Sequence, residues 1–207
     1  MMRLYRANFS TNAERVALAL GHKGLEVESR YIDYADRSEV QRVSGQDLIP
    51  VLVDGDKVVT DSTRIVVYVD ELIPTHQPLF PNDDVRYAEM MFFIDWFNRV
   101  WKQAPNLIAA QLASEEPDHM LVIGAGREMA AALDGFETLL RGRDFLMSKE
   151  LSAVDCAVFP FVKYALKREP ADNEPFHRIL DEYQQLDEYE HGRLRSWIKR
   201  VDALPRA

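Results

Sequence analysis

The chain has 207 residues, of which 47% are hydrophobic, and a formal net charge of −9 at pH 7. This content supplies a packed core, and the length suits one medium domain or two small ones. The acidic balance argues against non-specific nucleic-acid binding, which needs clustered Lys and Arg. No apolar run is long enough to cross a bilayer, and we expect no signal peptide at Met2-Arg3-Leu4-Tyr5. Because Cys156 is the only cysteine, no internal disulfide can form, and we expect a reducing, cytoplasmic compartment.

The first third of the chain alternates strand and helix signals. Hydrophobic periodicity predicts strands at 3–7, 27–33, 51–53 and 57–60, and helices at 13–20, 37–44 and 63–73. The last two strands are joined by Asp54-Gly55-Asp56, which is a strong hairpin signal. This β-α-β-α-β-β-α order predicts a small mixed sheet with helices on its faces.

The segment Leu48-Ile49-Pro50-Val51-Leu52 places a proline at the start of an apolar run that otherwise indicates a buried strand. Proline cannot donate to a sheet ladder. We therefore expect a cis Ile49–Pro50 bond that turns the backbone of Ile49 outward, where an extended ligand can pair with it. Asp61-Ser62-Thr63 then starts a helix whose side-chain oxygens and free N–H groups face the same cleft. The two segments together predict a corner that holds a small peptide.

The rest of the chain is predicted to be helical. Three prolines within 74–81 cannot continue a helix, so we expect a linker at 75–82 between a domain at 1–74 and a second at 83–207. Helices are expected at 86–112 with a kink at Pro105, at 119–140, at 152–167 with a bend at Pro160, near Tyr183 and at 194–201.

Three features, in this order and spacing, resemble the glutathione transferase superfamily. They are the turn Phe9-Ser10-Thr11-Asn12, the Ile-Pro-Val-Leu corner with Asp61-Ser62, and Ser152-Ala153-Val154-Asp155, which is similar to the family's internal capping box. The resemblance covers nearly the whole chain. It implies an α/β plus all-α protein with a thioredoxin-like βαβαββα domain and a helical-bundle domain. Ser44-Gly45-Gln46 and Thr60-Asp61-Ser62-Thr63 are most similar to bacterial and cyanobacterial serine-type members.

The resemblance implies a glutathione transferase, with glutathione as cosubstrate and no metal, that activates the glutathione thiol for conjugation or peroxide reduction of small electrophiles. Ser10 is the candidate catalytic residue, because its hydroxyl lies before a helix N-terminus and can stabilise a thiolate. Thr11 and Asn12 are alternatives, and Tyr5 is a rival for which packing in the strand is favoured. Ser10 could also be simply the helix cap.

The same resemblance assigns the rest of glutathione. It places the Ile49 backbone beside Pro50 against the cysteinyl part, and Asp61 and Ser62 against the γ-glutamyl end. Asn12 and Gln46 complete the candidate set. One departure stands out: Leu48 occupies the position where family members often carry Lys, Arg or Gln for the glycyl carboxylate. Gln46, Arg42 and Arg37 are the candidates to replace that residue.

The candidate walls of the electrophile pocket, expected between the two domains, are Trp96, Phe97 and Trp101. A helical aromatic stripe is more commonly core, so packing is the alternative. The five histidines show no metal-ligand spacing. A homodimer is expected by analogy, with no nucleic-acid or membrane partner. Two other functions stay open: an interaction module similar to the stringent starvation protein, which Leu48 favours, and a carrier of apolar ligands.

Overall fold

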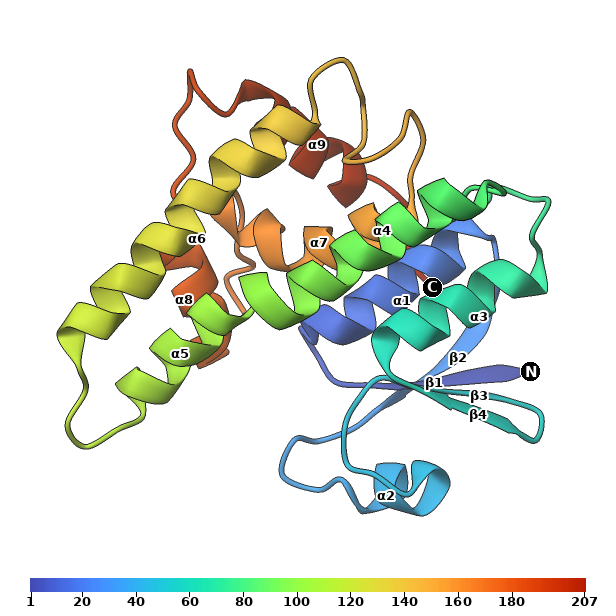
Figure 1. Ribbon diagram of the computed structural model, residues 1–207. Helices are drawn as coiled ribbons and strands as arrows, with labels where there is room; N and C mark the ends of the chain where they lie inside the picture. The colour runs from blue at the N-terminus through green and yellow to red at the C-terminus, as the bar shows by residue number, and fades with distance from the viewer. The chain divides into compact units, whose positions relative to one another are not determined.

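The computed structural model describes residues 1–207, which form two compact units (Figure 1). The first unit contains residues 1–82 together with 204–207, and the second contains residues 83–203. A four-stranded mixed sheet with helices is followed along the chain by an all-helical unit. The predicted fold class is therefore confirmed. No helix combines the length and the apolar character needed to span a membrane.

The first unit follows the predicted element order. Its elements are β1 (Met2–Arg6), α1 (Thr11–His22), β2 (Val27–Tyr31), α2 (Ser38–Ser44), β3 (Val51–Asp54), β4 (Lys57–Thr60) and α3 (Ser62–Leu72). The sheet order is β2-β1-β3-β4, with β1 parallel to β2 and antiparallel to β3. The β3–β4 hairpin turns at Gly55, whose φ of 58° lies in the left-handed region that glycine tolerates. The predicted hairpin is confirmed.

The strands β1 and β3 place alternate residues on opposite faces of the sheet. Tyr5 pairs with Val51 in the register, and both belong to a core cluster with Ile32 and Val40 of α2. Leu4 and Leu52 therefore face the other side. Figure 1 shows α2 on one side of the sheet and α1 and α3 on the other. Because Tyr5 is only 3% exposed and packs in this cluster, the packing role expected for it is confirmed.

A buried ion pair holds the segment that follows α3 against the first unit. The Nζ atom of Lys23 lies 2.6 Å from Oδ1 of Asp70, and it also donates to the carbonyl groups of Ile73 and His76. Asp70 accepts the backbone N–H groups of Leu79 and Phe80, which are both buried. The structure thus differs from the expected linker, since this proline-rich segment is fixed to α1 and α3.

The C-terminal residues 204–207 also belong to the first unit, whereas the sequence placed them with the helices. The N–H of Ala207 donates to the carbonyl of Ala17 in α1. A Cβ atom at Gly21 would lie 2.4 Å from the carbonyl oxygen of Pro205, so only glycine allows this close approach.

The second unit is entirely helical. Its elements are α4 (Asp84–Trp96), the π-helical η1 (Phe97–Trp101), α5 (Gln103–Leu112), α6 (His119–Leu139), α7 (Ala153–Val162), the 3₁₀ segment η2 (Lys163–Ala165), α8 (Pro175–Tyr183) and α9 (Gly192–Asp202). The single helix expected at 86–112 is wrong, because the π segment interrupts it. Pro105 lies in the first turn of α5, where a missing N–H costs no intrahelical bond. The kink expected at Pro105 stays a prediction.

The helix α7 is the buried centre of this unit, as predicted. All ten of its residues are buried, including Cys156 and Pro160, and the helix continues past Pro160 before it tightens into η2. The capping box is present: Asp155 accepts the backbone N–H of Ser152 and also that of Leu146. The indole of Trp197 in α9 donates to the same carboxylate. Burial raises the pKa of Asp155, against the effect of these donors.

Candidate functional site

Ser10 begins α1 as its N-cap. Its backbone is extended, and its Oγ accepts the N–H of Ala13 at 3.2 Å. The capping role is therefore confirmed. A hydroxyl that accepts one hydrogen bond still carries a proton to donate, so the cap does not preclude a bond to a ligand sulfur. Of the other two candidates in this turn, Thr11 is buried and Asn12 is half-buried.

The Ile49–Pro50 peptide bond is cis, as the sequence predicts. Pro50 is buried directly before β3, and Ile49 is half-buried. The structure shows no hydrogen bond within the protein to the backbone of Ile49. This leaves its N–H and C=O groups available to an extended ligand beside β3.

Asp61 and Ser62 form the start of α3. Asp61 has a φ of 69°, and its Oδ1 accepts the N–H groups of Thr63 at 3.0 Å and Arg64 at 3.1 Å. Both bonds use Oδ1, and the side chain is exposed, so Oδ2 remains for a cation. The capping and binding roles of Asp61 are therefore compatible. Ser62, the first residue of the helix, is 6% exposed.

Arg15 connects the two helix N-termini and was not found by sequence reasoning. Its Nη1 donates to Oγ of Ser62 at 3.4 Å, and the residue is 2% exposed. Arg15 lies about one turn into α1, and α1 packs against α3. The start of α3 therefore lies within reach of the Arg15 side chain, near the first turns of α1. The available signal was a charged residue on the apolar side of a helix, between Ala13 and Val16.

Three residues were candidates to replace a basic side chain at position 48, and the loop before Pro50 shows their contacts. Leu48 itself is 68% exposed. The Gln46 side-chain amide bonds both the N–H and the C=O of Leu48, and the Arg37 guanidinium donates to the carbonyl groups of Asp47 and Tyr34. These two residues therefore shape the loop. Arg42 is exposed, and no ion pair involves it.

Two of the three aromatic candidates for an electrophile pocket belong to the core of the second unit. Phe97 has no exposed surface, and Trp101 is 5% exposed. Their rings stack with centroids 4.5 Å apart, and both contact Phe136 and Phe161. The packing alternative accounts for this pair. Trp96 is half-buried, and its pocket role stays a prediction.

Comparison with known proteins identifies the family. Residues 4–77 match the model of the glutathione S-transferase N-terminal domain, and residues 95–200 match the model of the C-terminal domain. The chain belongs to the glutathione S-transferase family. Glutathione S-transferase Z1 of Arabidopsis thaliana is 39% identical over 198 residues, which cover 90% of this chain and 87% of that relative. A zeta-class enzyme of Euphorbia esula is 26% identical over 202 residues, or 92% of this chain and 89% of the relative.

Solved structures of glutathione S-transferases have the same fold. The tau-class glutathione S-transferase of mango, Mangifera indica, superposes with a TM-score of 0.79 at 22% identity, over 99% of this chain and 89% of that one. Rice GST1 in complex with glutathione gives a TM-score of 0.76 at 26% identity, over 98% and 86%. The family assignment confirms the predicted enzyme class, with glutathione as cosubstrate. The serine-type subclass and the individual site residues stay predictions.

Proposed function

We propose that this glutathione transferase holds glutathione at the corner formed by Ile49, Pro50, Asp61 and Ser62, and activates its thiol for attack on small electrophiles. The observation that carries the proposal is the juxtaposition of a backbone without internal hydrogen bonds at Ile49 and a helix start at Ser62, linked to α1 through Arg15. The reaction is conjugation or the reduction of organic hydroperoxides, and the biological role typical of the family is detoxification.

The cysteinyl and γ-glutamyl parts of glutathione each meet complementary hydrogen-bonding or charged groups. The backbone of Ile49 pairs with the cysteinyl backbone of glutathione in the manner of an added strand. Oδ2 of Asp61 accepts the γ-glutamyl ammonium, while the hydroxyl of Ser62 and the start of α3 bind the adjacent carboxylate. Arg15, buried behind Ser62, adds positive charge at that carboxylate.

Thiol activation is assigned to Ser10. A free thiol has a pKa of about 8.5, so little thiolate exists at neutral pH. The Ser10 hydroxyl donates to the sulfur while its oxygen keeps the Ala13 N–H, and the N-terminus of α1 adds its positive potential. Asn12 lies in the same first turn and borders the ligand. The thiolate then attacks the electrophile.

The glycyl carboxylate of glutathione needs a cation that Leu48 does not provide. Arg42 of α2 is the residue we assign, because Gln46 and Arg37 are already bonded to the loop backbone. Gln46 then contributes by holding the loop that presents Ile49. A charge-assisted hydrogen bond of this kind contributes about 1.5–3 kcal/mol.

Isothermal titration with reduced glutathione at neutral pH tests the site. Asp61→Asn removes the charge that meets the ammonium, and we expect its Kd to rise at least tenfold. Asp83→Asn is the matched control, because Asp83 caps α4 through the N–H of Arg86 but belongs to the second unit. Equal Kd values for the two variants, with binding retained, would place glutathione elsewhere.

A second candidate function is a non-catalytic interaction module, which the exposed Leu48 favours. Absence of heat in the titration, together with no thermal shift at high glutathione, would support it over the transferase reaction. For either function we propose a cytosolic location, in line with the single buried cysteine, and a homodimeric assembly.

A further inference from the structure

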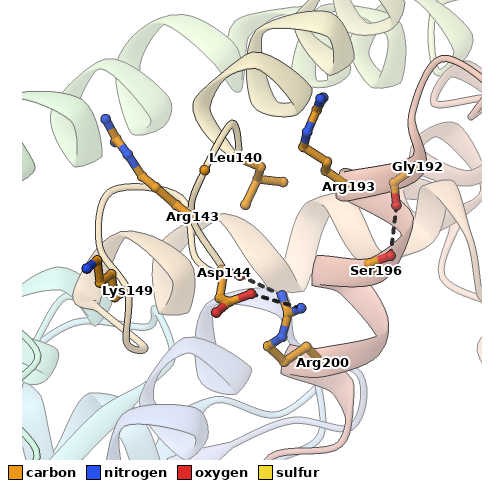
Figure 2. Close-up of a pocket in the computed structure, with 9 residues that line it drawn as sticks. Leu140, Arg143, Asp144, Lys149, Gly192, Arg193, Ser196 and Arg200 are labelled. Carbon is orange, nitrogen blue, oxygen red and sulfur yellow. Dashed lines mark hydrogen bonds and ion pairs between the residues drawn. The ribbon is translucent and has the colours of Figure 1, made fainter.

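The second unit contains a cavity of about 480 Å³ that the transferase reaction does not use. It lies between α9 and the loop that follows the C-terminal end of α6 (Figure 2). Its lining includes Gly142 and Lys149 from the loop and Gly192 and Ser196 from α9. None of these residues belongs to the glutathione site proposed above, which lies wholly in the first unit.

The cavity is basic in a chain that is acidic overall. Four basic side chains line it (Arg143, Lys149, Arg193 and Arg200), against one acidic side chain, Asp144. The chain as a whole carries a formal charge of −9. This local excess of cations makes the electrostatic potential at the cavity more positive, which attracts anions. The overall composition of the chain does not predict such a site.

Two of the four cations are paired, and two are not. Arg193 lies 2.7 Å from Oε1 of Glu137, and Arg200 pairs with Asp144 at 3.3 Å and donates to its carbonyl group. The structure shows no ion pair for Arg143 or Lys149. In Figure 2 these two side chains lie on the left of the view, and the Arg200–Asp144 pair lies to their right.

The N-terminus of α9 is not itself the anion site. Glu137 of α6 accepts the backbone N–H groups of Arg193 and Leu194, so a protein carboxylate already satisfies this helix end. The attraction for an external anion therefore comes from the side chains, above all from the unpaired Arg143 and Lys149. Ser196, whose hydroxyl bonds the carbonyl of Gly192, adds a neutral polar group to the lining.

We propose that this cavity binds a small organic phosphate, with the unpaired Arg143 and Lys149 as the main cations for the phosphate group. The guanidinium group offers a planar fork of donors that fits phosphate oxygens, and the ammonium group offers a compact point charge. A phosphate monoester is close to a dianion at pH 7 and so matches two cations, whereas one carboxylate matches only one. The volume leaves room for the organic part of the ligand beside the paired Arg193 and Arg200.

Pyrophosphate is the probe for a first test, by isothermal titration at low salt with the full chain. We expect one binding site and an affinity that falls as salt is added. The double variant Arg143→Gln/Lys149→Gln should weaken binding at least tenfold. Both side chains are exposed, so the thermal midpoint should change little.

The matched control is Arg127→Gln/Arg178→Gln, which removes the same charge from exposed positions on α6 and α8 outside the cavity. It should bind pyrophosphate as the unmodified protein does. An equal loss of pyrophosphate affinity in both double variants would mean that only overall charge matters, and it would overturn the proposal. Absence of pyrophosphate binding to the unmodified protein would also overturn it.

Two competition experiments define the class of ligand and show whether its site is distinct from the glutathione site. Glucose 6-phosphate should displace pyrophosphate, whereas gluconate, a sugar acid with one carboxylate, should displace it much less at the same concentration. Displacement by gluconate at equal strength would overturn the assignment to phosphate. Saturating glutathione should leave pyrophosphate binding unchanged, and competition between them would overturn the placement of the site in the second unit.

Discussion

At Ser10 one hydroxyl caps α1 and is assigned to the glutathione sulfur, so Ser10→Ala should change two properties. Loss of the bond from Ala13 should lower the free energy of unfolding by about 1 kcal/mol, as for other serine caps. Loss of the donor to the sulfur should raise the pKa of the bound thiol. Turnover at pH 7 should fall, and the pH profile of kcat should move to alkaline values. Ultraviolet titration of the bound thiolate measures this pKa directly.

Asp118→Ala separates the two effects of Ser10→Ala. Asp118 caps α6 by accepting the N–H groups of Met120 and Leu121, in the second unit. Its loss should reduce stability without changing the pKa of the bound thiol. If Ser10→Ala also leaves that pKa unchanged, Ser10 is only a cap, and the activator must be sought at Thr11 or Asn12.

A second residue-scale prediction concerns acid stability in the second unit. Burial raises the pKa of Asp172, but hydrogen bonds from His177 and Tyr164 outweigh burial and hold this pKa below its usual range. A carboxyl group whose pKa is lower in the folded state than in the unfolded chain stabilises the fold at pH values above its unfolded pKa of about 3.9. This contribution is lost as the pH falls through the folded pKa. Tyr164→Phe should therefore cost about 1.5–3 kcal/mol at pH 7 and less near pH 3.

Urea unfolding of Tyr164→Phe at the two pH values measures this difference. Tyr189→Phe is the control, because Tyr189 is 93% exposed and should give no change at either pH. A cost for Tyr164→Phe that is the same at both pH values would mean that lost packing, and not the hydrogen bond to an ionised Asp172, dominates.

At the scale of elements, the Lys23–Asp70 pair fixes residues 73–80 to α1 and α3. The Lys23 side chain has no exposed surface, and that of Asp70 is 12% exposed. Removing one partner of a buried pair leaves the other charge without compensation, which typically costs about 3–5 kcal/mol. Asp70→Ala should lower the free energy of unfolding by this amount, because it also removes the acceptor for Leu79 and Phe80. Urea unfolding at pH 7 measures the loss.

Glu28→Ala provides the comparison for Asp70→Ala. Glu28 pairs with Arg3 at 3.3 Å, with side chains 37% and 44% exposed, so its loss should cost less than about 1 kcal/mol. Similar costs for the two variants would show that the buried pair makes no special contribution. In that case the segment 75–82 would behave as the linker that its prolines suggest.

Local sequence patterns predicted those parts of the molecule that depend on neighbouring residues. The alternation of Leu4, Tyr5, Val51 and Leu52, the Asp54–Asp56 turn and the cis Ile49–Pro50 bond are all present. The start of α3 at Asp61 and Ser62 is also present, because capping depends on a few adjacent residues.

Features that depend on distant contacts were missed or wrong. The expected helix at 86–112 is interrupted by the π segment, where Phe97 and Trp101 stack inside an aromatic core that includes residues of α6 and α7. Arg15 reaches Ser62 across 47 positions of sequence. No local pattern reports such contacts, because the partner becomes known only when the helices pack.

At the scale of the whole molecule, net charge is a sum that does not report local regions of the opposite sign. The charge of −9 argues against non-specific nucleic-acid binding, yet the α6–α9 cavity gathers four basic side chains. Discrete anion binding requires a few cations at one place, and a chain of any net charge can supply them. Composition therefore constrains the general class of partner but does not predict individual sites.

The last prediction concerns assembly. Val85 and Phe92 are 68% and 76% exposed and lie seven positions apart on α4, so they share one helix face. A two-fold dimer would bury such a face against its own copy. We expect a dimer at micromolar concentration in sedimentation velocity and a shift toward monomer for Phe92→Asp. Tyr189→Asp places the same charge at another exposed position and should stay dimeric. A monomeric unmodified protein would contradict the predicted homodimer. A Phe92→Asp variant that stays dimeric would instead move the interface away from this face of α4.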